Sequence, residues 1–104
     1  MISKKELRKI KRRIKLVMDK HLESRELGSN LTDLSYRLAY FDIKISRQTL
    51  NNWYRGVYLP SAKTLNGALV KFYLMDDERR DITPFVNFLI ELLGVVTDGE
   101  KPTK

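Results

Sequence analysis

The spacing of its apolar residues most constrains the fold of this chain, because they recur three and four positions apart in five separate segments. That period of about 3.6 residues is the period of an α-helix, whereas strands alternate with a period of two. Breaks separate the segments, among them Gly28-Ser29-Asn30, the stretch from Gly56 to Pro60 and a charged connection at residues 75–81, and no run alternates as a half-buried strand would. The pattern predicts an all-α domain of five helices within the 104 residues.

Capping residues place the ends of these helices. Ser3 and Glu6 form a capping-box pattern, and Ser46 and Ser61 are suitable N-caps. Gly56 and Gly94 are expected to end the third and fifth helices. One domain is expected over residues 1–96, with a disordered tail over 97–104. The helices are expected at Lys4 to about Arg25, about Thr32 to Phe41, Arg47 to Arg55, Ser61 to about Leu74, and Thr83 to about Leu93.

The connection between the second and third helices depends on where the second helix ends. Phe41 continues the apolar face of Leu34 and Leu38, which leaves a turn of about two residues before the next helix. If Leu38 were the last core position instead, the connection would hold an excess of about five residues. We prefer Phe41 as the last core residue of the second helix.

Basic charge is concentrated at the start of the chain. The whole chain carries 20 basic and 13 acidic residues, for a net charge of +7. The first 20 residues hold nine basic and two acidic residues, so the remainder is close to neutral. A basic block of this kind suits phosphate backbones or anionic membranes. It could place Lys11, Arg12 and Lys15 near a DNA backbone, or it could simply form a solvated helix face.

Several classes of protein are disfavoured by composition. There is no cysteine, which excludes disulfides and thiolate sites. The N-terminus has no apolar run of signal-peptide length, and the apolar stretch near the C-terminus is broken by Asn87 and Glu91. We therefore expect a soluble cytoplasmic protein with no membrane partner.

No catalytic or metal-binding constellation can be assembled from the sequence. His21 falls on the apolar face of the first helix and is expected to be packed there. The acidic run at residues 76–78 lacks the glycine and alternating ligands of a calcium loop, so a solvated helix end is expected. With no phosphate loop, nucleophile elbow or zinc spacing, we expect no enzyme activity, no cofactor and no metal.

The third predicted helix lies within the stretch SRQTLNNWYRGVYLPS, residues 46–61. On a helical wheel Leu50 and Trp53 fall together as apolar anchors. Arginine, glutamine and asparagine side chains occupy the opposite side, and these residue types can bond guanine or adenine edges in a bidentate manner. No acidic residue occurs between Lys44 and Met75. A solvated helix that contacts nothing is the alternative.

This stretch resembles part of a known family. Thr49, Leu50, Trp53 and Gly56, followed by Pro60-Ser61 and Thr64-Leu65, are similar to the helix-turn-helix domain of phage repressors, Cro and related XRE-type bacterial regulators. The resemblance covers about residues 31–72. It implies a five-helix, lambda-repressor-like fold with a helix-turn-helix at about 32–56, preceded here by a basic N-terminal helix.

The resemblance also implies roles for individual residues. It places the base-reading positions at Arg47, Gln48, Asn51 and Asn52. Backbone contacts are expected from Lys44, Ser46, Thr49, Arg55, Tyr58, Ser61 and Lys63, with Lys11, Arg12 and Lys15 as additional phosphate contacts from the basic helix.

The fifth predicted helix is apolar over an arc of about 200°, whereas packing on one small core needs about 100°. The excess predicts a second copy of the chain as partner. The residues expected to form this homodimer are Phe85, Phe88, Leu89 and Leu92. Alternatively, the helix is cradled between the first and fourth helices of its own chain.

Together these features predict a sequence-specific double-stranded DNA-binding transcriptional regulator, most simply a repressor from a phage or bacterium. Two alternatives stay open. One is a protein-interaction module on the same fold, such as the antitoxin half of a toxin–antitoxin pair. The other is a non-specific nucleic-acid-binding or nucleoid protein driven by the basic first helix.

Overall fold

The structure is a computed structural model that describes residues 3–75 and 82–100, with side chains to residue 97. Within these ranges the secondary structure consists of five α-helices and no strand, which confirms the all-α class. Four of the predicted helices agree with the structure to within one residue at each end. The helices are α1 (Lys4–Ser24), α2 (Leu31–Tyr40), α3 (Arg47–Arg55), α4 (Ala62–Leu74) and α5 (Thr83–Glu100).

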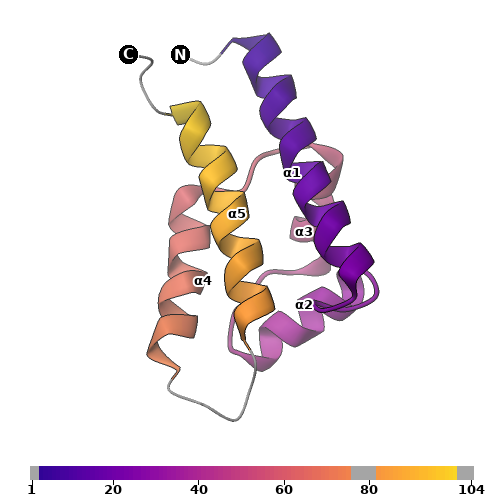
Figure 1. The fold of residues 1–104 in the computed structure, drawn as a ribbon, viewed down its shortest axis with the longest axis vertical. Helices are drawn as coiled ribbons and strands as arrows, with labels where there is room; N and C mark the ends of the chain where they lie inside the picture. The colour runs from indigo at the N-terminus through magenta and orange to yellow at the C-terminus, as the bar shows by residue number, and fades with distance from the viewer. Residues whose placement is uncertain (1–2, 76–81, 101–104) are drawn as a thin grey trace.

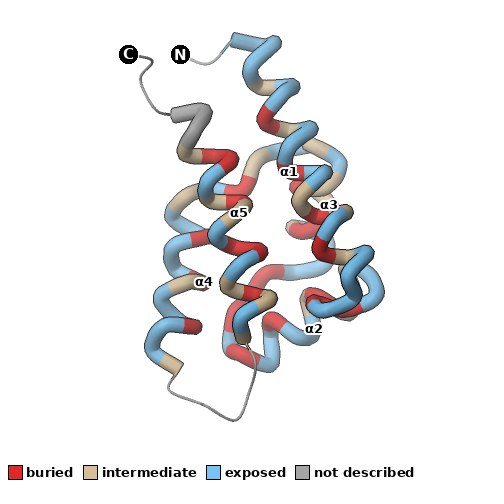
Figure 2. Tube along the Cα trace, viewed as in Figure 1, coloured by how far each residue is buried: buried red, intermediate tan, exposed pale blue. Residues whose placement is uncertain are grey.

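The helix α5 occupies the centre of the fold, with α1 on one side and α4 on the other (Figure 1). The shorter helices α2 and α3 pack against each other, and α3 also packs against α1. Buried positions on all five helices face the interior, whereas the first turns of α1 are largely exposed (Figure 2). The basic end of α1 therefore extends beyond the packed core.

Three phenylalanine rings join the end of α2 to α4 and α5. The ring centroid of Phe41 lies 5.2 Å from that of Phe72 and 5.4 Å from that of Phe85. Phe72 and Phe85 stack with their centroids 5.9 Å apart. Burying each side chain of this size contributes roughly 2–3 kcal/mol to the stability of the fold. The cluster therefore fixes the end of α2 against α4 and α5.

The end of α2 confirms the assignment of Phe41 to the core. Phe41 is the C-cap and is buried. The amide of Asp42 donates to the Ala39 carbonyl, and the amide of Ile43 donates to the Leu38 carbonyl. This is a Schellman ending, which requires a left-handed residue, and Asp42 has a φ of 61°. The chain is thereby turned toward α3.

The end of α5 corrects the prediction. The helix does not stop at Gly94 but continues to Glu100, so residues 97–100 are not the disordered tail expected there. Val95 and Val96 are 5% and 4% exposed, and this burial outweighs the roughly 1 kcal/mol that a glycine costs inside a helix. The charged connection expected at residues 76–81 and the last residues, 101–104, lie outside the described part of the chain.

Candidate nucleic-acid interface

Two buried side chains and two capping residues fix α3 in place. Leu50 is fully buried and Trp53 is 2% exposed. Ser46 caps the helix: its Oγ accepts from the Thr49 amide at 3.1 Å. Gly56 ends it in the left-handed conformation, with a φ of 72°. The helix therefore has a defined start, a defined end and one inward side.

The opposite side of α3 carries polar side chains that the sequence predicted to be there. Arg47, Gln48 and Arg55 are exposed, and Asn51 and Asn52 are half-buried. We call these five residues the α3 outer face. It contains two guanidinium groups and three amides and no carboxylate, so it offers hydrogen bonds and positive charge together.

Asn52 is held by a residue beyond the helix. Its Nδ2 donates to the Tyr58 hydroxyl at 3.3 Å. The hydrogen bond from Asn52, with a further one from the side chain of Thr49, lowers the pKa of Tyr58 below its usual value. Tyr58 is 45% exposed, so it lies at the rim of the α3 outer face and orients one of its amides.

The two serines predicted to contact a DNA backbone are used as caps. Ser46 Oγ donates to Thr49 Oγ1 at 3.0 Å, and Ser61 Oγ donates to Thr64 Oγ1 at 2.9 Å. Ser61 Oγ also accepts from the Thr64 amide. Since each serine directs its hydrogen at a threonine and the Thr49 side chain in turn hydrogen-bonds Tyr58, the Thr64 hydroxyl is the group left to donate outward. Thr64, which is exposed, was not among the predicted site residues.

Two lysines of the predicted backbone set, Lys44 and Lys63, are both exposed. Lys44 lies in the connection before α3, and Lys63 lies in the first turn of α4. They therefore lie on the two segments that precede and follow α3 in the chain.

The basic helix α1 lies directly beside α3. The side chain of Lys11 lies against Gly56, with its Cδ 3.2 Å from where a Cβ on that glycine would be. The Nζ of Lys15 lies 5.4 Å from the centroid of the Tyr54 ring, a cation–π distance. The Tyr54 hydroxyl donates to Asp19 Oδ1 at 2.7 Å, and this hydrogen bond, with burial, raises the pKa of Tyr54.

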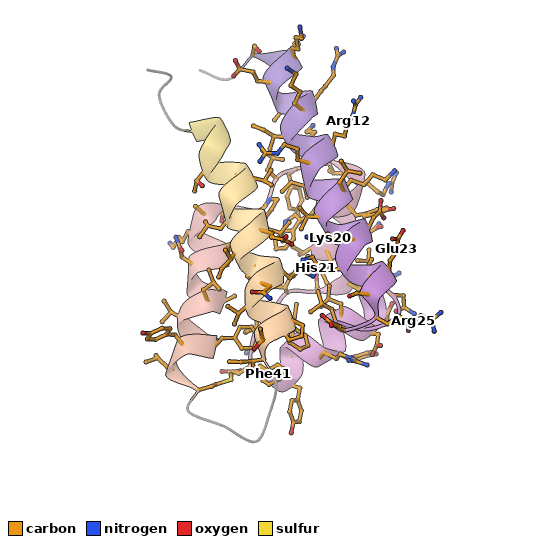
Figure 3. All side chains as sticks on the ribbon, in the orientation of Figure 1. Arg12, Lys20, His21, Glu23, Arg25 and Phe41 are labelled. Atoms are coloured by element: carbon orange, nitrogen blue, oxygen red, sulfur yellow. The ribbon has the colours of Figure 1, made fainter. Side chains whose placement is uncertain are left out.

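The third predicted α1 residue, Arg12, does not take part in these contacts. Arg12 is exposed and lies on the side of α1 away from α5 (Figure 3). Only Lys11 and Lys15 of the predicted α1 set are brought against α3.

A shallow groove of about 450 Å³ separates α2 from the start of α3. Its α2 wall consists of Thr32, Ser35, Tyr36 and Ala39. Tyr36 is 71% exposed. This surface was not predicted, although the sequence indicates it by four uncharged residues at helical spacing on the side of α2 away from the core. Lys44, Ile45, Ser46 and Arg47 form the other wall.

The residues predicted to form a dimer interface lie in the core of the chain instead. Their exposed fractions are 6% for Phe85, 1% for Phe88 and 0% for Leu89 and Leu92. The wide apolar arc of α5 is covered on one side by α1 and on the other by α4 of the same chain. The arc therefore gives no reason to expect a second copy at these four residues.

His21 is buried, as expected, but it has a partner that its sequence position did not reveal. Its Nε2 is hydrogen-bonded to Glu91 Oε2 on α5, and Lys20 Nζ bonds Glu91 Oε1 at 2.5 Å. Lys20 and His21 both lie on the α5 side of α1 in Figure 3. Burial would raise the pKa of Glu91, but the bonds from Lys20 and His21 outweigh it and lower that pKa. This cluster holds α1 against α5.

Within the described part of the chain, no three histidine or acidic side chains are grouped so that they could hold a metal ion. The acidic run at residues 76–78 falls outside that part. None of the described helices is long and apolar enough to cross a membrane.

No family model matches this chain, and comparisons with curated proteins and with solved structures likewise found no match.

Proposed function

We propose that this protein binds double-stranded DNA in a sequence-specific manner and acts as a cytoplasmic transcriptional regulator, most simply a repressor. The observation that carries the proposal is the α3 outer face. Five side chains, all arginine, glutamine or asparagine, project from a short helix that two buried residues and two caps hold rigidly. An ordinary solvated helix would carry glutamate and lysine pairs instead.

The chemistry of this face matches the major groove of B-DNA. Arg47 could donate two hydrogen bonds to O6 and N7 of guanine, and Gln48, Asn51 and Asn52 could each pair with N6 and N7 of adenine. Of these amides Asn52 is the one already oriented, by its hydrogen bond to Tyr58. Helix-turn-helix proteins of the phage-repressor type insert their second helix in this way, and α2, its connection and α3 would correspond to that motif.

Groups on both sides of α3 would hold the DNA backbone. Lys44 precedes the helix, and Thr64 and Lys63 lie in the first turn of α4. The groove beside α2 adds the hydroxyl of Tyr36, whereas the Ser35 hydroxyl already donates to the Thr32 carbonyl. Such phosphate contacts fix the register of a protein on DNA without selecting a sequence.

A second candidate function is a protein-interaction module, as in an antitoxin, and one observation favours it. Three large apolar residues are exposed on α4: Val70 at 55%, Tyr73 at 91% and Leu74 at 76%. Exposed apolar patches of this kind often mark contacts with another protein. A homodimer remains a prediction as well, and this α4 patch is a more accessible surface for it than the buried residues of α5.

Selection of bound sites from a randomised duplex pool tests the main proposal. Wild-type protein is compared with Arg47→Ala/Gln48→Ala and with Lys5→Ala/Asn87→Ala. The second variant also removes one cation and one amide, but from exposed positions on α1 and α5. We expect one enriched motif for the wild type and the control, and none for the α3 variant.

Equal enrichment by all three proteins would rule out α3 as the reading helix. Binding without any enriched motif would favour a non-specific nucleoid protein. The interaction module would be favoured if the wild type bound no DNA and retained a second polypeptide that the Tyr73→Ser variant lost.

A further inference from the structure

The N-terminal half of α1 carries basic residues on two different sides, and only one of them faces α3. Lys4, Arg8, Lys11 and Lys15 recur at intervals of four, three and four, so they share one side of the helix. Lys11 touches Gly56 and Lys15 lies over Tyr54, which fixes the direction of that side. We call these four residues the α1 ridge.

The ridge extends the positively charged surface beyond the end of α3. Lys11 lies level with Gly56, the C-cap of α3, whereas Arg8 and Lys4 lie about one and two turns nearer the exposed N-terminal end of α1. Both are exposed. From Lys4 to Lys15 the ridge is about 16 Å long, at a rise of 1.5 Å per residue.

Among the described residues of α1, the ridge meets negative charge on its own side only at its C-terminal end. Asp19, one turn after Lys15, carries that charge and accepts a hydrogen bond from Tyr54. Glu6, in the first turn, falls on a different side of the helix from Lys4 and Arg8. The exposed Lys4 and Arg8 therefore have no acidic residue on their own side of α1, while Lys11 and Lys15 lie against α3.

We propose that the α1 ridge is a second DNA-binding surface, which grips the phosphate backbone of duplex DNA flanking the site contacted by α3. This inference rests on the proposed function of α3. Phosphates on one strand are spaced about 3.4 Å along the duplex axis, so a ridge of about 16 Å covers roughly five base-pair steps. The contacts would raise affinity and salt dependence without adding sequence preference.

The chain offers a matched pair of variants. Lys4→Gln/Arg8→Gln removes two charges from the ridge, and Lys5→Gln/Lys9→Gln removes two charges from exposed positions about 100° around the same turns. Glutamine keeps the helix propensity close to that of lysine and arginine, so both variants are expected to fold as the wild type does. Thermal melts followed by circular dichroism check this.

Affinity is measured over a range of salt concentrations on two duplexes. One carries the selected site with ten extra base pairs on each side, and the other is trimmed to the site. On the long duplex the ridge variant should flatten the slope of log Kd against log salt by about 1.8, which is 0.9 for each lost phosphate contact. The control variant should keep the wild-type slope, and on the trimmed duplex all three slopes should agree.

Equal slopes for both variants on the long duplex would overturn the proposed DNA-binding role of the α1 ridge, since net charge alone would then explain binding. So would a ridge variant that loses affinity for phosphatidylserine vesicles while its DNA slope is unchanged. The long duplex with an unrelated sequence separates the two proposals. A ridge effect without any site preference would overturn the sequence-specific function alone, whereas site preference without a ridge effect would overturn this inference alone.

Discussion

Lys11 on α1 and Gly56 at the end of α3 are in direct contact: the lysine Cδ lies 3.2 Å from the position that a Cβ on Gly56 would take. The contact depends on a residue with no side chain in a left-handed conformation, at a φ of 72°. It brings the basic helix to the end of the helix that carries the polar outer face. Together with the contacts of Tyr54 to Lys15 and Asp19, this glycine sets the relative position of the two surfaces.

Gly56→Ala should lower the free energy of unfolding by about 1–2 kcal/mol, because alanine is strained in the left-handed region. Urea unfolding followed by circular dichroism measures the change. Gly67→Ala is the matched control: that glycine is inside α4 and a Cβ there would meet nothing within 4 Å. It should stabilise the protein by roughly 0.5–1 kcal/mol. The same sign for both variants would contradict this account.

Asp42→Gly should stabilise the protein by roughly 0.5–1 kcal/mol, since the residue ends α2 at a φ of 61° where glycine is unstrained. The substitution removes an ion pair between Asp42 Oδ2 and Lys71 Nζ at 3.5 Å. That aspartate is 80% exposed, so the pair contributes little. Lys71 also donates to the backbone carbonyl of residue 42, and this bond is kept. A lower urea midpoint for the variant would show that the ion pair matters more than the backbone.

Glu91 should make stability depend on pH in the acid range. Its pKa in the folded protein lies below the ordinary 4.5, so its contribution is present above that pH and is lost as pH falls further. Glu91→Gln should unfold more easily at pH 7, by up to about 1 kcal/mol, since the carboxylate is 35% exposed. Between pH 7 and pH 3 the variant should lose less stability than the wild type. Glu23→Gln, on the side of α1 away from α5, is the control for the change in net charge. An identical pH dependence of stability for the wild type and Glu91→Gln would be evidence against a stabilising role of the Lys20–His21–Glu91 cluster.

Tyr58→Phe tests a positioning role on the proposed DNA surface. Removing the hydroxyl frees Asn52, so discrimination at the base that Asn52 contacts should fall by about tenfold, within the 1–3 kcal/mol of one bidentate pair. Stability should change little, because Tyr58 is 45% exposed. Competition assays with single-base variants of the selected site provide the readout. A uniform loss across all sequences would instead assign the hydroxyl to a phosphate.

Local signals in the sequence were enough to predict most of the helix boundaries. Ser46 and Gly56 bracket α3 because capping depends on a few neighbouring atoms. Phe41 could be assigned to the core because it continues the apolar face of α2. The α3 outer face followed from the same wheel, since Leu50 and Trp53 leave only one side for the polar residues.

The errors arose where tertiary contacts outweigh local preference. Gly94 is a helix terminator in isolation, but buried Val95 and Val96 keep α5 helical beyond it. The breadth of the α5 apolar arc was visible, but one sequence does not reveal whether α4 or another chain covers it. The pairing of His21 with Glu91 joins residues 70 positions apart, and no spacing rule reports such a contact.

The length of α3 limits what one copy of the protein could recognise. Nine residues form a rod of about 13 Å, which spans only about four base pairs. A given sequence of four base pairs recurs by chance roughly once in 250 base pairs, so a chromosome with millions of base pairs holds many competing sites. A single copy would therefore be bound mostly at chance matches. Recognition of one site in a genome would require a second DNA-binding unit bound beside it.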